Sequence, residues 1–454
     1  VALVADYPGS VTTSSNPVSS PAASPSAWSA PTASGALDAV VAIPGSKSLT
    51  NRYLLLAALA SEPTHLVRPL HSRDSALMIE ALRALGAQIE ILDGADVLIT
   101  PAPSLRGDVS IDCGLAGTVM RFVPPLAALA GGAVHFDGDP HARTRPMSGV
   151  IDGLTALGVP VDHEGAEVRT LPFTVHGTGA VSGGRVEVDA SASSQFVSAL
   201  LLVAAAFENG IDLHHVGERV PSQPHIDMTI TVLQRQGVDA TQVSAGHWRV
   251  APGPIAGGRL VVEPDLSNTG PFLAAALVAG GRVVIPDWPV TTTQPGDDLR
   301  EILTSMGAAV THREDGALEV VGTGSIKGID LDLTKAGELA PTIAALMTLA
   351  DGPSRLTGIA HLRGHETDRL AALVTEIQRL GGHARELPDG LEIEPAPLRG
   401  AQLESYADHR MATFGAIIGL AVPGVGVVDI ATTAKTLPDF PGMWTGMLAG
   451  KDAM

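Results

Sequence analysis

The stretch Gly45-Ser46-Lys47-Ser48-Leu49-Thr50-Asn51-Arg52 joins a strand-like run to a long apolar run. Residues 39–44 form the strand-like run, and residues 53–60 are apolar enough to continue a buried helix. Small residues at such a turn leave backbone N–H groups and the positive end of the helix dipole facing outward. Lys47 and Arg52 add two cations. The stretch therefore predicts an anion-binding helix start, although it lacks the spacing of a P-loop.

The same architecture recurs six times along the chain. A helix-like segment ending in an apolar residue and a glycine returns every 70 to 80 residues or so, with its final glycine at Gly86, Gly158, Gly237, Gly307, Gly381 and Gly450. A second, more apolar helix precedes each of these and keeps nearly the same period. Its six copies begin near Ser48, Gly117, Ser194, Asn268, Leu339 and His409.

Each unit reads as strand, apolar helix, strand, amphipathic helix and a short pair of strands, which makes the chain an α/β protein. The apolar helix is expected at the centre of its domain and the amphipathic helix outside it. Because a single core stops growing beyond about 250–300 residues, six such units favour two domains of three. The repeat alone does not establish that division.

Composition excludes several partners. The 454 residues carry a net charge of −19, which argues against nucleic acid or an anionic membrane as a partner. The single Cys113 excludes an internal disulfide and fits a reducing, cytoplasmic compartment. Apolar runs are too short to span a bilayer. Residues 1–36 are rich in Ser, Pro, Ala and Thr without the pattern of a signal peptide, so we expect a disordered, dispensable tail.

Cations stand at helix starts in four of the six units. Lysine and arginine are disfavoured there, because the helix dipole is positive at that end. Hydroxyl and Asp residues at the same positions are explained as ordinary helix caps. The cations instead predict anion sites, and they are Lys47, Arg52, Arg145, Arg369, Arg410 and Lys435.

These motifs together resemble those of the 5-enolpyruvylshikimate-3-phosphate synthase family over about residues 37–445. The matching segments are Pro44-Gly-Ser-Lys-Ser48, Asn51-Arg52, Leu115-Ala-Gly-Thr118, Arg121, Arg145-Pro146, Ser193-Ser-Gln195, Glu366-Thr-Asp-Arg369-Leu370, Asp408-His-Arg-Met411 and Ala434-Lys-Thr-Leu-Pro438-Asp439. The resemblance implies transfer of the enolpyruvyl group of phosphoenolpyruvate to the 5-hydroxyl of shikimate 3-phosphate, with release of phosphate, on the chorismate pathway.

The resemblance also implies a fold and domain limits. It implies two domains, each of three βαβαββ units, in the inside-out α/β barrel of the enolpyruvyl transferases. One domain would cover residues 47–263, and the other residues 37–46 and 264–454. The two would close on the substrates about two crossover segments. The expected partners are the two small-molecule substrates alone, the expected state is a monomer, and no metal or other cofactor is implied.

The same resemblance assigns residues to roles. Shikimate 3-phosphate would contact Lys47, Ser48, Arg52, Ser193, Ser194, Gln195, Ser222, Glu338, His361 and His365. Phosphoenolpyruvate would contact Lys47, Gly117, Arg145, Gln195, Arg369, Arg410 and Lys435. Glu338 would act as the base on the 5-hydroxyl. Glu366 would give a proton to the methylene carbon, with Lys47 and His409 as supporting acids.

The chain departs from the family pattern at four of these places. His225 replaces a usual Tyr, His361 and His365 replace Asn and Lys near the shikimate phosphate, and Glu338 replaces Asp. Because only a protonated His365 can make a charge-assisted bond to a phosphate, we expect shikimate 3-phosphate to bind more weakly from about pH 6 to 9. The spacing of His361 and His365 would suit a metal ion if this segment were helical. Gly364 and an expected helix start at Glu366 make a helix across the segment unfavourable.

Two other functions fit parts of the pattern. The sister family, which transfers enolpyruvate to UDP-N-acetylglucosamine, usually carries a reactive Cys in the loop before the Arg-Pro pair. Residues 137–145 form that loop here and contain no Cys. The third reading is a non-catalytic anion-binding protein on the same fold, which the presence of all the acid–base candidates disfavours.

Overall fold

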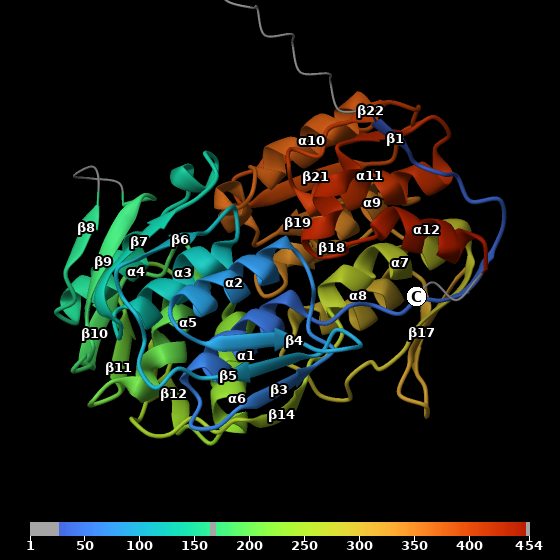
Figure 1. Cartoon of the computed structure of the whole chain (residues 1–454). Coiled ribbons are helices and arrows are strands. Elements are labelled where there is room, and N and C mark those ends of the chain that lie inside the picture. Colours follow the sequence, from blue (N-terminus) through green and yellow to red (C-terminus); the bar gives the residue numbers. More distant parts are fainter. Residues whose placement is uncertain (1–26, 164–168, 451–454) are drawn as a thin grey trace, which may run out of the picture.

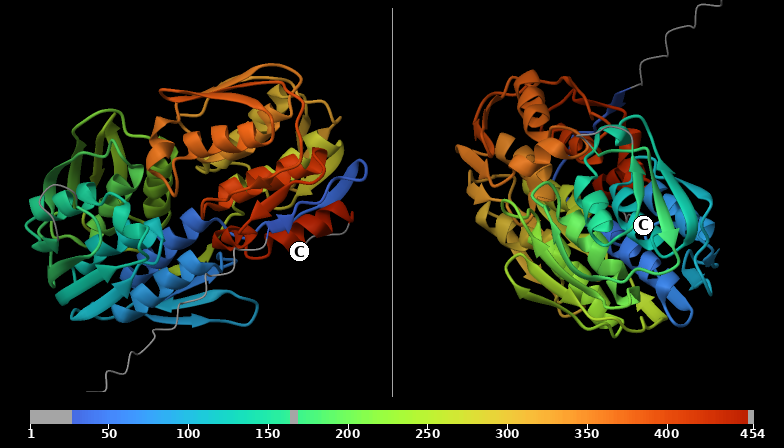
Figure 2. Two further views of the ribbon diagram at one scale, coloured as in Figure 1. Left: turned by 90° about the horizontal axis from the view of Figure 1, so that it is seen from above. Right: turned by 90° about the vertical axis from the view of Figure 1, so that its left-hand side faces the viewer.

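The repeated unit folds as a small sheet with its helices, and the chain has six of them. The computed structural model describes residues 27–163 and 169–450. These residues form two lobes (Figure 1), which are also distinct from above (Figure 2). Five of the sheets have four strands in one common order, in which the first two strands of the unit are parallel and the other two antiparallel. The predicted α/β repeat is confirmed.

The first lobe contains three units. Unit one has α1 (Lys47–Leu59), α2 (Arg73–Ala84), β3 (Thr64–Val67), β4 (Gln88–Ile91), β5 (Val97–Thr100) and β14 (Gly258–Val261). Unit two has α3 (Gly117–Ala127), η1 (Ala142–Thr144), α4 (Ser148–Ala156), β6 (Val109–Asp112), β7 (Gly131–Asp137), β8 (Val161–His163) and β9 (Phe173–Thr178). Unit three has α5 (Ser194–Val203), η2 (Ala204–Ala206), α6 (Gln223–Arg235), β10 (Gly184–Val188), β11 (Ile211–His215), β12 (Ala240–Ser244) and β13 (His247–Val250).

The second lobe contains the other three. Unit four has α7 (Leu266–Ala279), η3 (Pro295–Asp298), α8 (Leu299–Ser305), β2 (Leu37–Val40), β15 (Gly281–Ile285), β16 (Ala309–His312) and β17 (Leu318–Gly322). Unit five has η4 (Gly337–Leu339), α9 (Ala340–Thr348), η5 (Ala360–Gly364), α10 (Arg369–Arg379), β18 (Asp330–Asp332), β19 (Ser354–Thr357), β20 (His383–Leu387) and β21 (Gly390–Glu394). Unit six has α11 (His409–Ala421), η6 (Ile430–Lys435), α12 (Phe440–Leu448), β22 (Gln402–Leu403), β23 (Gly426–Val428) and β1 (Ala27–Ser29).

The recurring glycines end the outer helices. Each lies two residues beyond its helix, and all six have positive φ, between 63° at Gly450 and 111° at Gly86. An L side chain is strained in that conformation, whereas glycine is not. The six glycines recur because six helices need the same stop.

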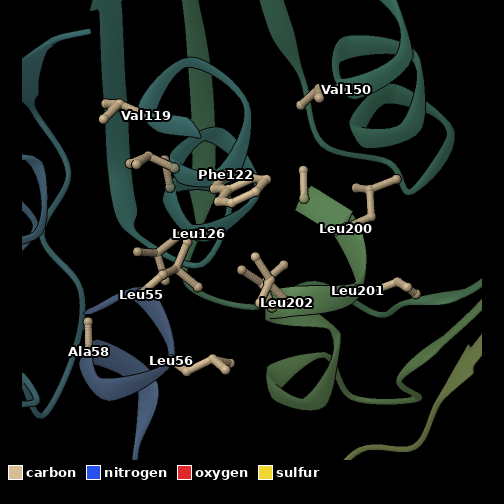
Figure 3. Close-up of a cluster of buried hydrophobic side chains, with 14 of the residues drawn as sticks. Leu55, Leu56, Ala58, Val119, Phe122, Leu126, Val150, Leu200, Leu201 and Leu202 are labelled. Atoms are coloured by element: carbon tan, nitrogen blue, oxygen red, sulfur yellow. The ribbon is translucent and has the colours of Figure 1, made fainter. Parts of the chain in front are cut away.

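The apolar helices form the two cores. Helices α1, α3 and α5 share one cluster of buried side chains, in which Leu55, Phe122 and Leu200 are shielded from solvent (Figure 3). Helices α7, α9 and α11 share a second cluster, which also includes side chains of β2. The expected central position of the apolar helices is confirmed. The expected domain limits stay a proposal, with residues 27–36 added to the second domain, because the first cluster lies within residues 47–263 and the second within residues 27–46 and 264–450.

Two chain segments connect the lobes and lie side by side. The first leads from β2 into α1, and the second from β14 into α7. Ser46 donates its backbone N–H to Glu263 O at 2.8 Å, and Asp265 donates to Pro44 O at 2.9 Å. These bonds place the starts of α1 and α7 together at the junction between the lobes. The sequence stretch that opens α1 is therefore held at the hinge.

The expected disordered tail is wrong for residues 27–36. β1 pairs antiparallel with β23, and Ala30 donates its backbone N–H to Val425 O at 3.0 Å. Ala30 is buried, and the Trp28 ring packs edge-on to Phe440 with centroids 6.2 Å apart. In unit six, residues 402–450 contribute β22 and β23 to the sheet, and β1 adds an antiparallel strand beside β23. Residues 27–36 therefore belong to the second lobe. Residues 1–26 of the expected tail lie outside the described residues.

The helices were also compared with the length of a bilayer. None in the described parts of the chain is both long and apolar enough to cross one.

Candidate active site

The apolar-helix starts of both lobes converge on one cavity of about 170 Å³. The first lobe contributes the starts of α1, α3 and α5, and the second lobe those of α7, α9 and α11. Every predicted site residue except Arg52 lines this cavity. They are Lys47, Ser48, Gly117, Arg145, Ser193, Ser194, Gln195, Ser222, Glu338, His361, His365, Glu366, Arg369, His409, Arg410 and Lys435.

Arg52 is buried and does not line the cavity, so its expected contact with substrate stays a prediction. Its Nε donates to Thr229 Oγ1 at 2.8 Å, and its two terminal nitrogens donate to Ser48 O and His225 O, both at 3.0 Å. Burial lowers the pKa of Arg52 to about 9. The guanidinium is engaged with protein oxygens, and it fixes the backbone of two residues that do line the cavity.

The wall of the first lobe presents two guanidinium groups beside a glycine. Arg121 donates to Gln195 Oε1 at 2.8 Å, and Arg145 donates to Leu115 O at 3.3 Å. A Cβ at Gly117 would lie 3.0 Å from Arg145 and 3.2 Å from Arg121. Burial lowers the pKa of Arg121 well below its usual value, and the neighbouring Arg145 lowers it further. Neither guanidinium forms an ion pair with a carboxylate among the described residues, so the two adjacent cations strongly favour an anion.

On the wall of the second lobe, cationic side chains form ion pairs with carboxylates. Arg369 donates from Nε to Asp408 Oδ2 at 2.7 Å, and Asp408 also caps α11 by accepting the Arg410 N–H. Glu366 lies between Lys435, whose Nζ is 2.5 Å from Oε1, and His409, whose Nδ1 is 3.1 Å from Oε2. These ion pairs and hydrogen bonds restrict the orientation of the side chains that form them.

These contacts decide the charge of the proton-donor candidates. Burial would raise the pKa of Glu366, but Lys435 and His409 outweigh it and hold the pKa well below its usual value. Burial lowers the pKa of His409. These shifts favour an ionised Glu366 and a neutral His409 at neutral pH, and the expected role of Glu366 as the proton donor stays a prediction.

Lys47 sits at the junction between the lobes. Its Nζ lies 3.4 Å from Asp74 Oδ2, and its backbone N–H donates to Asp265 Oδ2 at 3.1 Å. Burial lowers its pKa, with Asp74 opposing that shift and Lys435 adding to it. A lysine with a lowered pKa releases its proton more readily than an exposed one.

Glu338 is oriented from both lobes. Ser267 Oγ donates to its Oε1 at 3.2 Å, and His225 Nε2 of the first lobe lies 3.9 Å from the same oxygen. Burial lowers the pKa of His225. The ring that replaces the usual Tyr thus faces the proposed base across the cleft.

His361 and His365 lie together at one end of the cavity. Their rings meet edge to face with centroids 5.6 Å apart. No helix carries both residues, as expected, because η5 ends at Gly364. The expected helix start at Glu366 is wrong, since α10 begins at Arg369 after the Asp368 cap. Burial lowers the pKa of His365 well below 6.5, and Arg369 lowers it further. His365 is therefore protonated less readily than a free imidazole, which moves the expected pH effect to more acidic solution.

Sequence reasoning missed several residues that shape the cavity. Arg121 was quoted in the motif but given no role, although it stands four residues after Gly117 as Arg52 stands four residues after Ser48. Asp74 and Asp408 were explained as helix caps, and Asp265 was not singled out. Asp265 and Asp408 are caps, and each of the three also contacts a predicted site residue. No local sequence pattern distinguishes an Asp that only caps a helix from an Asp that also contacts a cationic side chain.

Cys113 is remote from this chemistry. It is fully shielded from solvent and does not line the cavity. Burial raises the pKa of its thiol far above the usual range, with Asp112 and Asp137 adding to the shift. A neutral, buried thiol is not a nucleophile, so Cys113 does not supply the reactive Cys of the sister family.

Comparison with known proteins gives one consistent family. The family model described as EPSP synthase (3-phosphoshikimate 1-carboxyvinyltransferase) matches residues 31–444. The chain is 60% identical over 435 residues to the 3-phosphoshikimate 1-carboxyvinyltransferase of Kocuria rhizophila, covering 93% of this chain and 97% of that protein.

Solved structures agree on the fold. An EPSP synthase from Acinetobacter baumannii superposes with a TM-score of 0.77 at 23% identity, over 94% of this chain and 98% of that one. A second structure of EPSP synthase from the same organism gives a TM-score of 0.76 at 23% identity, over 92% and 97% of the two chains. At this identity the likeness shows the two-domain fold alone.

Proposed function

This chain belongs to the EPSP synthase family. We propose that the cavity between its lobes is the active site. The enzyme transfers the enolpyruvyl group of phosphoenolpyruvate to the 5-hydroxyl of shikimate 3-phosphate and releases phosphate, a step of aromatic amino acid biosynthesis. The alternative acceptor, UDP-N-acetylglucosamine, is not favoured by these relatives. What remains to be assigned is the role of each residue.

We assign phosphoenolpyruvate to the space between the arginines of the two walls. Arg145 and Arg121 face it from the first lobe, and Arg369, Arg410 and Lys435 face it from the second. The observation that carries this proposal is the adjacent pair of buried guanidiniums beside Gly117. A carboxylate and a phosphate on one small molecule need two cationic sites that face each other, and planar guanidiniums bind such groups with paired hydrogen bonds.

Shikimate 3-phosphate then occupies the side of the cavity lined by hydroxyls and amides. Ser48, Ser193, Ser194 and Ser222 come from the first lobe, and His361 and His365 close that end from the second. Ser193 caps α5 by accepting the Gln195 N–H at 3.2 Å, so a helix start faces this region. Hydroxyls and backbone N–H groups suit a phosphate and a ring of alcohols.

The reaction is an addition followed by an elimination. In the addition, Glu338 takes the 5-hydroxyl proton, the oxygen attacks C2 of phosphoenolpyruvate, and C3 accepts a proton. In the elimination, C3 loses a proton, the C2–O bond to the phosphoryl group breaks, and phosphate leaves. Glu338 suits the first role because Ser267 orients one of its oxygens and leaves the other for the substrate.

We propose that Lys47 supplies the proton to C3. Burial lowers the pKa of Lys47, which makes its ammonium group a readier acid. Against the effect of burial, Lys435 and His409 hold the pKa of Glu366 low, and burial lowers the pKa of His409, so both of these keep an acidic proton less readily. Glu366 would then act as a positioning residue, which holds Lys435 and His409. A bound phosphoenolpyruvate that draws Lys435 away would raise the pKa of Glu366 and let it share the proton.

The lobes must separate to admit the substrates. A cavity of about 170 Å³ is below the range of roughly 300–1,000 Å³ that is typical of small-molecule sites. Besides the approach of His225 to Glu338, the lobes are joined by contacts at exposed positions, such as His141 Nε2 to Glu366 O at 2.8 Å and Arg68 to Asp287 at 2.5 Å. Both involve exposed side chains, whose contacts are weak and salt-sensitive. We propose that they break as the lobes open about the paired connections.

We propose further that the enzyme acts as a cytoplasmic monomer. One chain supplies both walls of the cavity, and a single buried Cys113 suits a reducing compartment. Sedimentation of the full chain with and without substrates tests the monomer, since a stable dimer would contradict it.

The roles are tested by phosphate release with each acceptor in turn. We expect release with shikimate 3-phosphate and none with UDP-N-acetylglucosamine. Glu338→Gln should lower kcat by about 10²–10⁴-fold with little change in KM. Glu338→Asp should restore most of the rate, and exposed Glu208→Gln should change nothing. Normal turnover by Glu338→Gln would remove Glu338 from the mechanism but leave the family reaction standing.

A further inference from the structure

Two histidines and an aspartate meet on the outer face of the third sheet. β11 and β13 are antiparallel neighbours, and His214 and His247 lie directly opposite each other in their register. Asp212 is two residues before His214, so its side chain is on the same face of β11. The opposite face carries the buried Leu213 and Trp248, which belong to the core. The three polar residues therefore point outward together.

The three side chains converge on one point. His247 Nε2 lies 2.5 Å and His214 Nε2 lies 3.2 Å from the same atom, Oδ1 of Asp212. The two rings are stacked with centroids 4.0 Å apart and an angle of 19° between them. Ligand atoms around a tetrahedral zinc ion, at about 2.0–2.2 Å from the metal, lie roughly 3.3–3.5 Å apart. The rings must rotate to coordinate one ion, because an imidazole nitrogen binds a metal in the plane of its ring and the two planes are nearly parallel.

The protonation state and exposure of the group suit a metal. A hydrogen bond from His247 lowers the pKa of Asp212, so the carboxylate is ionised at neutral pH. The side chains are 18–32% exposed, which leaves a path for an ion and for the waters that would complete its coordination. Arg249 lies 3.5 Å from the second oxygen, Oδ2, and does not occupy the point where the rings converge.

We propose that Asp212, His214 and His247 form a binding site for a divalent transition-metal ion of the zinc class. Imidazole nitrogen and carboxylate oxygen are ligands such ions accept. Among the described residues, the other group of three with this spacing is Glu366, Asp408 and His409, which lies in the active cavity and already has Lys435 and Arg369 as partners.

The site is separate from catalysis. None of its residues lines the active cavity, and its sheet lies at the end of the first lobe away from the second (Figures 1 and 2). A bound ion would link β11 to β13. It would therefore stabilise the folded chain, since a ligand that binds the native state adds to its stability.

The chain offers matched controls on its other sheets. His176 Nε2 lies 2.7 Å from Asp162, and His65 Nε2 lies 3.0 Å from Asp96. Each is a histidine–carboxylate pair at a sheet surface, and among the described residues neither pair has a third ligand group close enough to share an ion. A pair supplies two ligands and should hold an ion much more weakly than the group of three.

The test is calorimetric titration of the EDTA-treated full chain with ZnCl₂. We expect one ion per chain, binding at least about tenfold weaker for His214→Ala and for His247→Ala, and unchanged binding for His176→Ala. Co²⁺ should give the visible absorption of a site with nitrogen ligands, and this band should vanish in His247→Ala. Both variants should keep wild-type turnover, which shows that they fold. No binding by the wild type, or equal binding by His247→Ala, would overturn the proposal.

Discussion

Arg369 and Asp408 form a two-point ion pair that is closed to solvent. Arg369 Nε lies 2.7 Å from Oδ2 and its NH2 lies 3.1 Å from Oδ1, and the side chains are 3% and 0% exposed. Arg369 is the first residue of α10, and Asp408 is the cap of α11. The pair therefore binds two helix starts together and leaves NH1 of Arg369 for an anion in the cavity.

Asp408→Asn should impair both stability and phosphoenolpyruvate binding. Removing one partner of a buried pair leaves an uncompensated charge, which costs about 3–5 kcal/mol, although a bound anion would recover part of it. We expect a lower free energy of unfolding in urea and a KM for phosphoenolpyruvate raised about tenfold or more. Asp368→Asn, which keeps a cap at α10, is the matched control and should change stability by less than about 1 kcal/mol. An unchanged KM in Asp408→Asn would mean that Arg369 does not depend on Asp408 for its position.

Gly117→Ala should disturb the two arginines of the first wall. The added Cβ would come within 3.0–3.2 Å of the Arg145 and Arg121 guanidiniums, which is closer than ordinary contact, so both must move by a few tenths of an ångström. We expect a higher KM for phosphoenolpyruvate, and weaker binding of bulkier mimics than of the substrate. The affinity for shikimate 3-phosphate should be nearly unchanged.

Steady-state kinetics with both substrates varied will separate these effects. Gly131→Ala is the control, because nothing lies within 4 Å of its Cβ position. Equal losses for substrate and mimics in Gly117→Ala would contradict the close-contact argument.

Features that depend on a few neighbouring residues could be predicted from the sequence. The glycine stops and the apolar-helix starts were recovered within about three residues, since a positive φ and a capped helix start are properties of a few neighbouring residues. The anion sites were also predictable, because cations such as Lys47 and Arg145 oppose the helix dipole.

Pairings between distant segments were not predictable. β1 meets β23 across about 400 residues of chain, and no pattern in the Ser- and Pro-rich start indicates a partner. Arg52 matched a binding motif, but Ser198, Thr229 and His225, far along the chain, occupy its guanidinium. Whether a cationic side chain is free to bind a ligand or is already hydrogen-bonded to the protein depends on such contacts. These contacts form only in the folded chain.

Truncation at the start of the chain should separate two segments. Removing residues 1–26 should leave activity and melting temperature unchanged. Removing residues 1–36 deletes β1 and the Trp28 contact with Phe440, and exposes the face of α11 that Ala30 covers. We expect the melting temperature to fall by about 5 °C or more. Trp28→Ala should give part of that loss, and exposed Ser29→Ala should give none. An unchanged melting temperature for the longer truncation would show that β1 does not stabilise unit six.

His365 should make the binding of shikimate 3-phosphate depend on pH only in acidic solution. In the free protein, burial and then Arg369 hold its pKa well below 6.5. A bound phosphate raises that pKa, so protonation and binding favour each other. The gain in affinity is complete below the free-protein pKa and is lost as the pH rises through the pKa of the complex. From pH 7 to 9 the ring stays neutral, and its contribution should be constant.

Calorimetry at pH 5.5 to 8.5 on three proteins tests this dependence. The phosphate of the ligand also titrates, with a second pKa near 6, but that effect is common to all three and cancels on comparison. Relative to His365→Gln, the wild type should gain affinity on acidification, by up to about tenfold, the worth of roughly one charge-assisted bond. His365→Lys should bind more tightly than the wild type at pH 7 to 8.5, where only the lysine brings a charge. Parallel curves for the wild type and His365→Gln would show that His365 stays neutral in the complex or does not touch the phosphate.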